Sequence, residues 1–142
     1  MTNHKRLLFK KLLRDNNHSI TTSRQIVFDL LDGQEPQSMH ALIQRAAGQV
    51  DRVSIYRIIA LYEKIGIVHR VTIGWKYKIE LSDIFLEHHH HLSCTLCKKV
   101  IVAKESPQIE ASIRQLSKTH GFTLTNHQLE LQGYCQKCRA QL

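Results

Sequence analysis

The stretch IVHRVTIGWKYKI, from Ile67 to Ile79, is rich in β-branched residues and alternates between apolar and polar side chains. Gly74 interrupts the alternation near its middle. Two alternating runs joined by a short turn that contains glycine are typical of a β-hairpin. The sequence therefore predicts a hairpin over residues 67–79.

Apolar residues at helical spacing precede this hairpin and predict four short helices. Serine or threonine marks the expected beginning of a helix, and glycine marks its expected end. The first helix is expected at 5–14, and the second runs from an N-cap at Thr22 or Ser23 to Gly33. The third follows an N-cap at Ser38, and the fourth is expected at 54–65, ahead of Gly66. Helices followed by a hairpin in this order predict a winged helix-turn-helix, whose last helix enters the major groove of DNA.

The charge distribution favours DNA binding over a helical domain that never touches DNA. Residues 1–79 hold 13 Lys and Arg against 6 Asp and Glu, a net charge of +7, whereas residues 80–142 hold 7 against 6, a net charge of +1. If Ile55 and Ile59 are buried, Arg57 turns to the opposite face of its helix, beside Tyr56. Arginine bonds to phosphate or guanine, and a tyrosine ring can contact a thymine methyl group.

Length and composition predict two modules in an α+β chain. With 142 residues, 42% of them hydrophobic, the chain can bury one ordinary core or two small ones. All 4 cysteines and six of the 10 histidines follow Ile79, so we expect modules at 1–79 and 80–142. No apolar run approaches the roughly 20 residues of a membrane span, and the first residues lack a signal-peptide cleavage pattern. We therefore expect a cytoplasmic protein.

The second module contains two Cys-x-x-Cys pairs, Cys94 with Cys97 and Cys135 with Cys138. Two such pairs can complete a tetrahedral shell of four thiolates around one Zn²⁺. A redox dithiol uses only one pair, and disulfides are rare in the cytoplasm, so structural zinc is the favoured interpretation.

The region between the two cysteine pairs predicts a small subdomain. The expected elements are a strand at 98–103, a helix at 108–120 with Ile109, Ile113 and Leu116 facing inward, and a strand-rich segment at 122–132. With a first strand over the histidine run, the order is β-β-α-β.

The stretch EHHHHLSCTLC, from Glu87 to Cys97, places four consecutive histidines ahead of the first cysteine pair. In a strand, His89 and His91 point to one face and His88 and His90 to the other. Two imidazoles at this spacing can chelate one ion such as Zn²⁺, Fe²⁺, Ni²⁺ or Cu²⁺. One strand could therefore serve two metal sites. The alternative is a solvated histidine run that binds metal adventitiously.

Several segments together carry a resemblance to a known family. They are Thr22-Ser23-Arg24, Ser54-Ile55-Tyr56-Arg57 with Gly66-Ile67-Val68, His88–Cys97, His120-Gly121-Phe122, Thr125-Asn126-His127 and Gly133-Tyr134-Cys135. From about Ile20 to Cys138 the chain resembles the ferric uptake regulator (Fur) superfamily of bacterial metal-dependent repressors. The resemblance implies a homodimer that pairs through the β-β-α-β module and binds a palindromic operator of metal-homeostasis genes. A divalent ion would act as corepressor by population shift. Neither a membrane nor a small organic substrate is implied as a partner.

The resemblance also implies roles for individual residues. The DNA-binding positions are Arg24, Arg52, Ser54, Tyr56, Arg57 and Arg70. The sensor metal site would use Glu80, His89 and His91, and a second metal site would use His88, His90, Glu110 and His127.

The chain departs from the family pattern at three places. The histidine that the family supplies just before the third helix is missing there, so we expect His40, or else Glu35, to replace it. Many relatives carry aspartate at His90 and a carboxylate at Val102. An imidazole-rich donor set favours Zn²⁺ over six-coordinate Fe²⁺ or Mn²⁺, whereas family membership favours iron. The regulatory ion is thus expected to be Fe²⁺ or Zn²⁺, with Mn²⁺ or Ni²⁺ ranked below them. Among the functions found in the family, a peroxide sensor ranks third, after iron and zinc sensing.

Two other classes of function remain open from the residues. A metal-storage or chaperone protein would use the histidines and leave the basic first half without a role. A zinc hydrolase would need an open coordination position and a general base such as Glu87 or Glu110.

Overall fold

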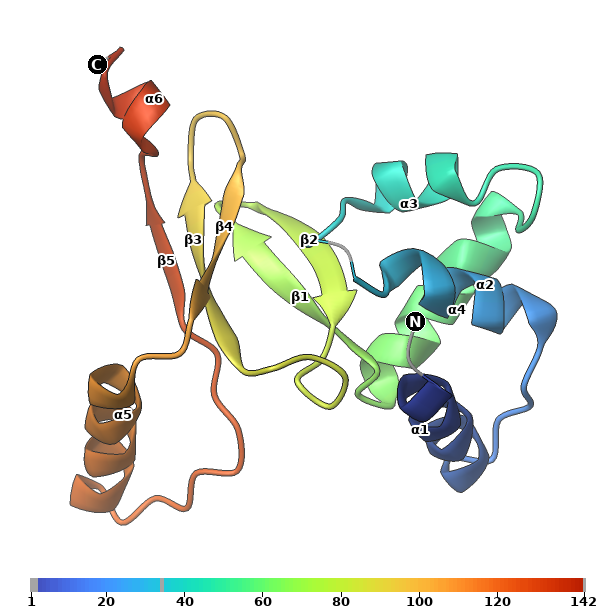
Figure 1. The fold of residues 1–142 in the computed structure, drawn as a ribbon, viewed down its shortest axis with the longest axis horizontal. Helices are drawn as coiled ribbons and strands as arrows, with labels where there is room; N and C mark the ends of the chain where they lie inside the picture. Colours follow the sequence, from blue (N-terminus) through green and yellow to red (C-terminus); the bar gives the residue numbers. More distant parts are fainter. Residues whose placement is uncertain (1–2, 34, 142) are drawn as a thin grey trace. The chain divides into compact units, whose positions relative to one another are not determined.

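The computed structural model describes residues 3–33 and 35–141, and the chain divides into two compact units, Met1–Glu87 and His88–Leu142 (Figure 1). The predicted α+β class is confirmed, with a winged helix-turn-helix in the first unit and a smaller sheet with helices in the second. None of the helices within the described ranges has the length and apolar character needed to cross a membrane.

The described residues of the first unit form four helices and a two-stranded hairpin, in the predicted order (Figure 1). They are α1 (Asn3–Asp15), α2 (Thr22–Leu31), α3 (Met39–Arg45), α4 (Arg52–Lys64), β1 (Val68–Ile73) and β2 (Lys76–Leu81). Ser38 caps α3 as predicted, because its hydroxyl accepts a hydrogen bond from the Ala41 N–H at 3.1 Å. The cap of α2 is Thr21 rather than Thr22 or Ser23, since Thr21 Oγ1 accepts from the Arg24 N–H.

The helix α4 begins earlier than predicted because Asp51 caps it. The Asp51 carboxylate accepts a hydrogen bond from the Ser54 N–H at 2.9 Å, which satisfies one of the open donors of the first turn. Hydrogen bonding from Ser54, first from its side chain and then from its N–H, lowers the pKa of Asp51 below its usual value. Ile55 and Ile59 are buried and Arg57 is exposed, so α4 presents its basic side to solvent as predicted.

Aromatic rings fill the core of the first unit. Phe9 of α1 stacks on Phe28 of α2 with ring centroids 4.3 Å apart, and Tyr62 of α4 meets Phe9 edge-on at 5.7 Å. The buried Tyr62 hydroxyl donates to the carbonyl oxygen of Arg24 at 2.5 Å. Since buried hydroxyl groups are costly when unpaired, this bond fixes α4 against the start of α2.

The hairpin is closed by a two-residue turn, Gly74-Trp75, between the paired residues Ile73 and Lys76. Gly74 has a φ of 62°, which glycine adopts without steric cost. Antiparallel pairing then places His69 opposite Glu80. An isolated bridge between Gln37 and Ile79 ties the segment before α3 to β2.

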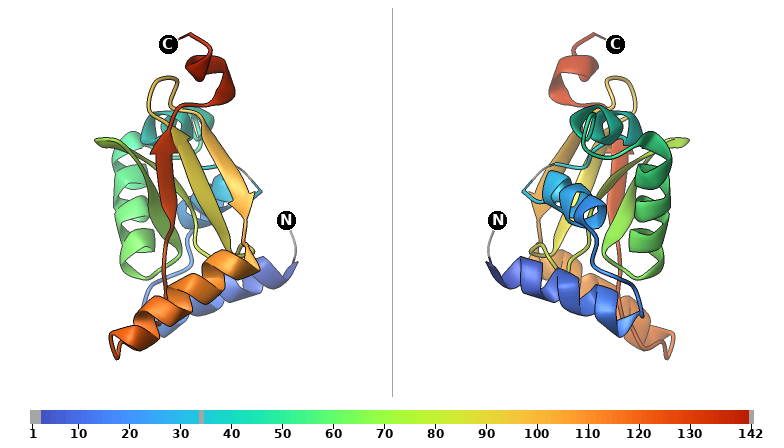
Figure 2. Two further views of the ribbon diagram at one scale, coloured as in Figure 1. Left: turned by 90° about the vertical axis from the view of Figure 1, so that its left-hand side faces the viewer. Right: turned by 90° about the vertical axis from the view of Figure 1, so that its right-hand side faces the viewer.

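As far as residue 141, the second unit forms a three-stranded sheet with a helix near each end (Figure 2). Its elements are β3 (His89–Cys94), β4 (Val100–Lys104), α5 (Pro107–Thr119), β5 (Glu130–Gly133) and α6 (Gln136–Arg139). The strand order is β4-β3-β5, with β4 antiparallel and β5 parallel to β3. The predicted β-β-α-β order is therefore confirmed.

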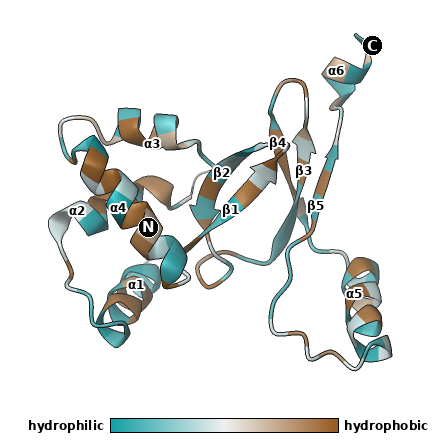
Figure 3. Ribbon diagram, turned by 180° about the vertical axis from the view of Figure 1, so that it is seen from behind, coloured by the Kyte–Doolittle hydropathy of each residue, from teal (hydrophilic) through white to brown (hydrophobic). Residues whose placement is uncertain are grey.

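Two details of this unit differ from the sequence prediction. The strand-rich segment expected at 122–132 contains a strand only from Glu130, because residues before it form no ladder with β3. The inward face predicted for α5 is also wrong, since Ile109 is 38% and Leu116 is 63% exposed. Hydrophobic residues nonetheless lie along α5 (Figure 3), so the apolar pattern is present without a covering layer.

Candidate metal centres

The four cysteines converge on one point although their pairs are far apart in the sequence. Parallel pairing of β3 with β5 aligns Cys94 with Gly133, and the Thr95 N–H donates to the Gly133 carbonyl oxygen at 2.9 Å. Cys135 and Cys138 follow at the start of α6. The four Sγ atoms all lie within 4.8 Å of one another. The predicted cysteine set is therefore brought together.

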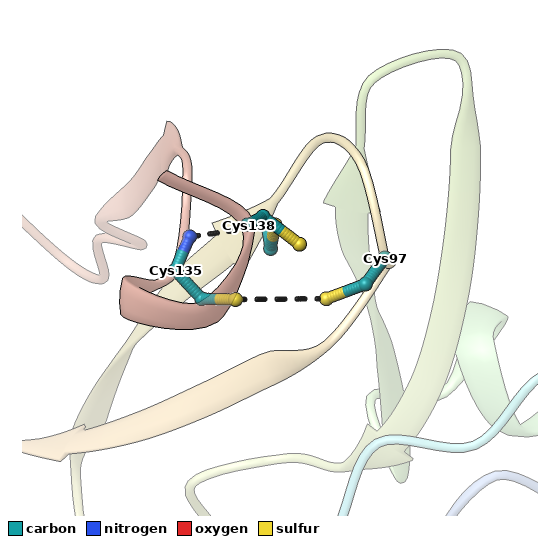
Figure 4. Close-up of side chains that lie close together, drawn as sticks. Cys97, Cys135 and Cys138 are labelled. Atoms are coloured by element: carbon teal, nitrogen blue, oxygen red, sulfur yellow. Dashed lines mark hydrogen bonds between the residues drawn. The ribbon is translucent and has the colours of Figure 1, made fainter. Parts of the chain in front are cut away.

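The spacing of the sulfurs fits a tetrahedral zinc ion. Four sulfurs at about 2.3 Å from one tetrahedral ion lie about 3.8 Å from each other. The Cys97 and Cys135 sulfurs are 3.8 Å apart and point toward one another (Figure 4). All four cysteines are free thiols rather than disulfides. The donor set and its geometry thus match a structural zinc site.

Backbone N–H groups prepare two of these sulfurs for metal. Hydrogen bonds from the N–H groups of Cys135, at 3.4 Å, and Cys97 lower the pKa of Cys94 to about 6. The Cys138 N–H likewise lowers the pKa of Cys135. Hydrogen bonding to Cys135 raises the pKa of Cys138 to about 12, so its proton must leave when an ion binds. Each Cys-x-x-Cys pair therefore offers one thiolate readily.

A second cluster joins three histidines to one carboxylate in the same unit. His88 precedes β3, His90 lies on it, Glu110 comes from α5, and His127 comes from the segment before β5. The Nε2 atoms of His90, His127 and His88 lie 3.0, 3.3 and 3.5 Å from Glu110 Oε1. The His88 and His127 Nε2 atoms are 3.1 Å apart. The four residues predicted for the second site are therefore brought together, with three nitrogens around one carboxylate oxygen.

The surroundings of this cluster favour a cation. Burial alone would raise the pKa of Glu110, but the neighbouring charges of His127 and His88 and the hydrogen bond from His90 lower it overall. His90 Nδ1 is buried and has no hydrogen-bond partner among the residues that the structure describes. Because three imidazoles converge on one carboxylate oxygen, a divalent ion would satisfy all four groups at once.

The residues predicted for the sensor site belong to different units. His89 and His91 point to the other face of β3, with ring centroids 4.8 Å apart, and His91 is 5% exposed. Glu80 lies on β2 in the first unit, where it is 3% exposed and bonds to His69. His40 is exposed on α3, and Glu35 is exposed before it. Whether these residues share one ion stays a prediction.

The DNA-binding residues predicted from the sequence lie on α2, α4 and β1 of the first unit. Arg24 and Arg57 line a surface hollow of about 260 Å³ together with Thr21, Ser23, Ser54 and Ile58. Tyr56 is 45% exposed on α4, and the Arg52 guanidinium lies 5.8 Å from the centre of its ring. The α2 and α4 helix starts thus combine hydroxyl and guanidinium groups, which bind phosphate oxygens.

Arg70 is already engaged within the first unit. Its Nε lies 2.6 Å from Glu63 Oε1 on α4, its Nη2 donates to Glu63 Oε2 at 2.9 Å, and its guanidinium stacks on Tyr77 at 4.2 Å. The hydrogen bond that Arg70 donates to Glu63 raises the pKa of Arg70. Arg70 therefore ties β1 to α4.

Sequence reasoning missed His69, whose Nε2 lies 2.8 Å from Glu80 Oε1. The hairpin prediction contained the necessary signal. With Gly74-Trp75 as a two-residue turn, residue 69 must pair with residue 80.

A winged helix-turn-helix unit joined to a unit with two clusters of metal-ligating side chains defines a metal-responsive DNA-binding regulator. The sequence pattern of the ferric uptake regulator family matches residues 15–132. A ferric uptake regulation protein of Campylobacter jejuni is 32% identical over 94% of this chain and 87% of its own length. The chain belongs to the ferric uptake regulator family, and it is a transcription regulator rather than an enzyme.

Solved structures agree with this assignment. The ferric uptake regulator of Vibrio cholerae aligns with a TM-score of 0.74 at 26% identity, over 89% of this chain and 98% of its own. A zinc uptake regulator solved with zinc and DNA aligns with a TM-score of 0.60 at 22% identity, over 99% and 97% of the two chains, which shows a shared fold.

Proposed function

We propose that this protein is a cytoplasmic repressor of metal-homeostasis genes that binds an inverted-repeat operator as a homodimer when a regulatory divalent ion is bound. The first unit would bind DNA, and the second would hold structural zinc and form the dimer. The observation that carries the proposal is the basic surface at the starts of α2 and α4 in a chain that also holds metal-ligand clusters.

The DNA contacts that we propose centre on α4. Tyr56 and Arg57 would meet base edges and phosphates of the major groove, and Arg52 and Ser54 would contact phosphates near the helix start. Arg24, which shares the surface hollow with Arg57, would add a phosphate contact from α2. Arg70 would hold the hairpin against α4 beside the DNA.

A second copy of the chain is the partner that we propose for the second unit. Apolar side chains are exposed on its sheet, where Leu92, Ile101, Leu131 and Tyr134 line a hollow of about 160 Å³ and are 38, 43, 50 and 54% exposed. The exposed apolar residues of α5 add to this surface. Contiguous apolar surface of this kind marks interfaces, and a two-fold axis would cover the same surface on both copies.

We propose two further metal sites besides structural zinc at Cys94, Cys97, Cys135 and Cys138. The sensor site would use Glu80, His89 and His91 together with one further ligand from the first unit, for which the sequence offers His40 or Glu35 as candidates. The second site would use His88, His90, Glu110 and His127. The imidazole-rich donor sets favour Zn²⁺, whereas membership in the ferric uptake regulator family favours Fe²⁺. Fe²⁺ or Zn²⁺ is therefore the proposed corepressor, with Ni²⁺ and Mn²⁺ ranked below them.

The proposal is tested by selecting genomic fragments with the zinc-loaded protein in the presence of excess Fe²⁺, Zn²⁺, Mn²⁺ or Ni²⁺, each at equal free concentration. We expect one ion to yield an inverted repeat and the chelator-treated control to yield none. Recovery of no palindromic sequence with any ion would contradict the proposal. Equal recovery with and without added ion would also contradict it.

A further inference from the structure

His69 and Glu80 face each other across the hairpin of the first unit. Their strands pair them directly, and His69 Nε2 lies 2.8 Å from Glu80 Oε1. The Glu80 side chain is 3% exposed and that of His69 is 19% exposed. The turn at Gly74-Trp75 fixes this register, so the two side chains are held together by the backbone.

We propose that His69 is a direct ligand of the regulatory ion and shares it with Glu80, so that the hairpin carries a rigid two-ligand half-site. This inference rests on the proposed function, because it requires a regulatory ion at Glu80. It assigns the imidazole contributed by the first unit to His69 instead of His40, which is exposed on α3.

The separation of the two ligand atoms matches neighbouring positions around one ion. Imidazole nitrogen and carboxylate oxygen bind Zn²⁺ at about 2.0–2.1 Å, so at angles of 90–109° the two atoms lie about 2.9–3.4 Å apart. The observed 2.8 Å requires only a small rotation of the side chains. When the ion binds, it replaces the hydrogen bond between the two groups, and a proton held between them passes to water.

Burial explains why this pair suits a cation. A carboxylate removed from water is unfavourable unless a positive charge or hydrogen bonds compensate it. A divalent ion supplies that charge. The low exposure of Glu80 also limits competing water, which strengthens ligation by the few donors present.

Binding at this half-site would stiffen the DNA-binding unit itself. The neighbour of His69 on β1 is Arg70, which forms two hydrogen bonds to Glu63 on α4. The neighbour of Glu80 on β2 is Ile79, which exchanges backbone hydrogen bonds of 2.8 and 2.7 Å with Gln37 ahead of α3. An ion that clamps β1 to β2 therefore acts on elements bonded to both helices of the DNA-binding motif.

The test uses Co²⁺ as a spectroscopic probe in the full-length, zinc-loaded protein carrying His127→Ala to disable the second cluster. In this background we compare His69→Ala, His69→Gln and His40→Ala, with His120→Ala at an exposed position after α5 as the matched control. Glutamine retains an N–H that can bond to Glu80 but offers no imidazole. Thermal unfolding checks that each variant is folded.

We expect both His69 variants to weaken Co²⁺ binding at least about tenfold and to remove one imidazole from the X-ray absorption spectrum of the bound ion. The His40 and His120 variants should leave affinity and imidazole count unchanged. Wild-type affinity in His69→Gln would show that His69 only positions Glu80 and would overturn the inference, as would an unchanged imidazole count in His69→Ala.

Failure of the proposed function has a separate signature. If the background protein binds Co²⁺ through His69 but the ion does not alter DNA binding, the half-site stands and the repressor proposal fails. If the ion promotes DNA binding equally in background protein and His69→Ala, the repressor proposal stands and the half-site fails.

Discussion

Substitution of Arg57 by alanine tests the proposed DNA surface through the salt dependence of binding. Arg57 is exposed on α4 and lines a hollow with Arg24, so its charge faces solvent. Each phosphate contact contributes about 0.9 to the slope of log affinity against log salt concentration. Loss of one contact per protomer lowers the slope by about 1.8 in the proposed dimer. The affinity penalty of Arg57→Ala should therefore shrink about 12-fold between about 50 and 200 mM salt.

The assay is fluorescence anisotropy of a labelled operator titrated with metal-loaded protein at four salt concentrations. Lys64→Ala is the matched control, because Lys64 carries the same charge and is exposed at the opposite end of the same helix. We expect its slope to stay close to the wild-type value. A slope unchanged in Arg57→Ala, or lowered equally in both variants, would refute a phosphate contact at Arg57.

Three further substitutions test the packing and the zinc site. Tyr62→Phe should lower the free energy of unfolding by about 0.5–1.5 kcal/mol at pH 8 in urea titrations, because it removes the bond to the Arg24 carbonyl. Burial raises the pKa of Tyr62, so its contribution is complete below about pH 10, where unfolded tyrosine begins to ionise, and declines at higher pH. The stability of the wild type relative to Tyr62→Phe should therefore fall between pH 8 and pH 11, and a constant difference would contradict this. Cys138→Ser should reduce the zinc content measured after dialysis against a weak chelator, whereas retention of one tightly bound zinc per chain would argue against four-thiolate coordination. Ser38→Ala should destabilise the first unit by about 1 kcal/mol through loss of the α3 cap, and an unchanged unfolding midpoint would show that the cap is dispensable.

The periodic pattern of apolar residues predicted those parts of the fold in which burial of one face of a helix or strand determines which side chains lie on the opposite face. Ile55 and Ile59 are buried on α4, and this places Arg57 in solvent as expected. Strand alternation likewise sends His88 and His90 toward Glu110 and turns His89 and His91 away. The cysteine spacing predicted the four-sulfur cluster because two tight turns can aim all four thiols at one ion.

Other features depend on what covers a surface or on the pairing register, and local pattern does not contain that information. The apolar side of α5 predicted an inward face, but Leu116 is 63% exposed because a single copy of the second unit leaves α5 at one end of its sheet. The segment before Glu130 has β-forming residues, yet in the described part of the chain the strand begins only at Glu130. The His69–Glu80 pair could have been found by counting outward from the turn at Gly74-Trp75.

Metal-dependent operator binding tests the central claim most directly. Protein with its structural zinc retained would be titrated onto the selected operator in chelator and then with the free regulatory ion held at fixed levels. Coupling between ion and DNA should tighten operator binding by about 5–150-fold and yield two protomers per operator. Equal affinity in chelator and in saturating ion would contradict a metal-responsive repressor.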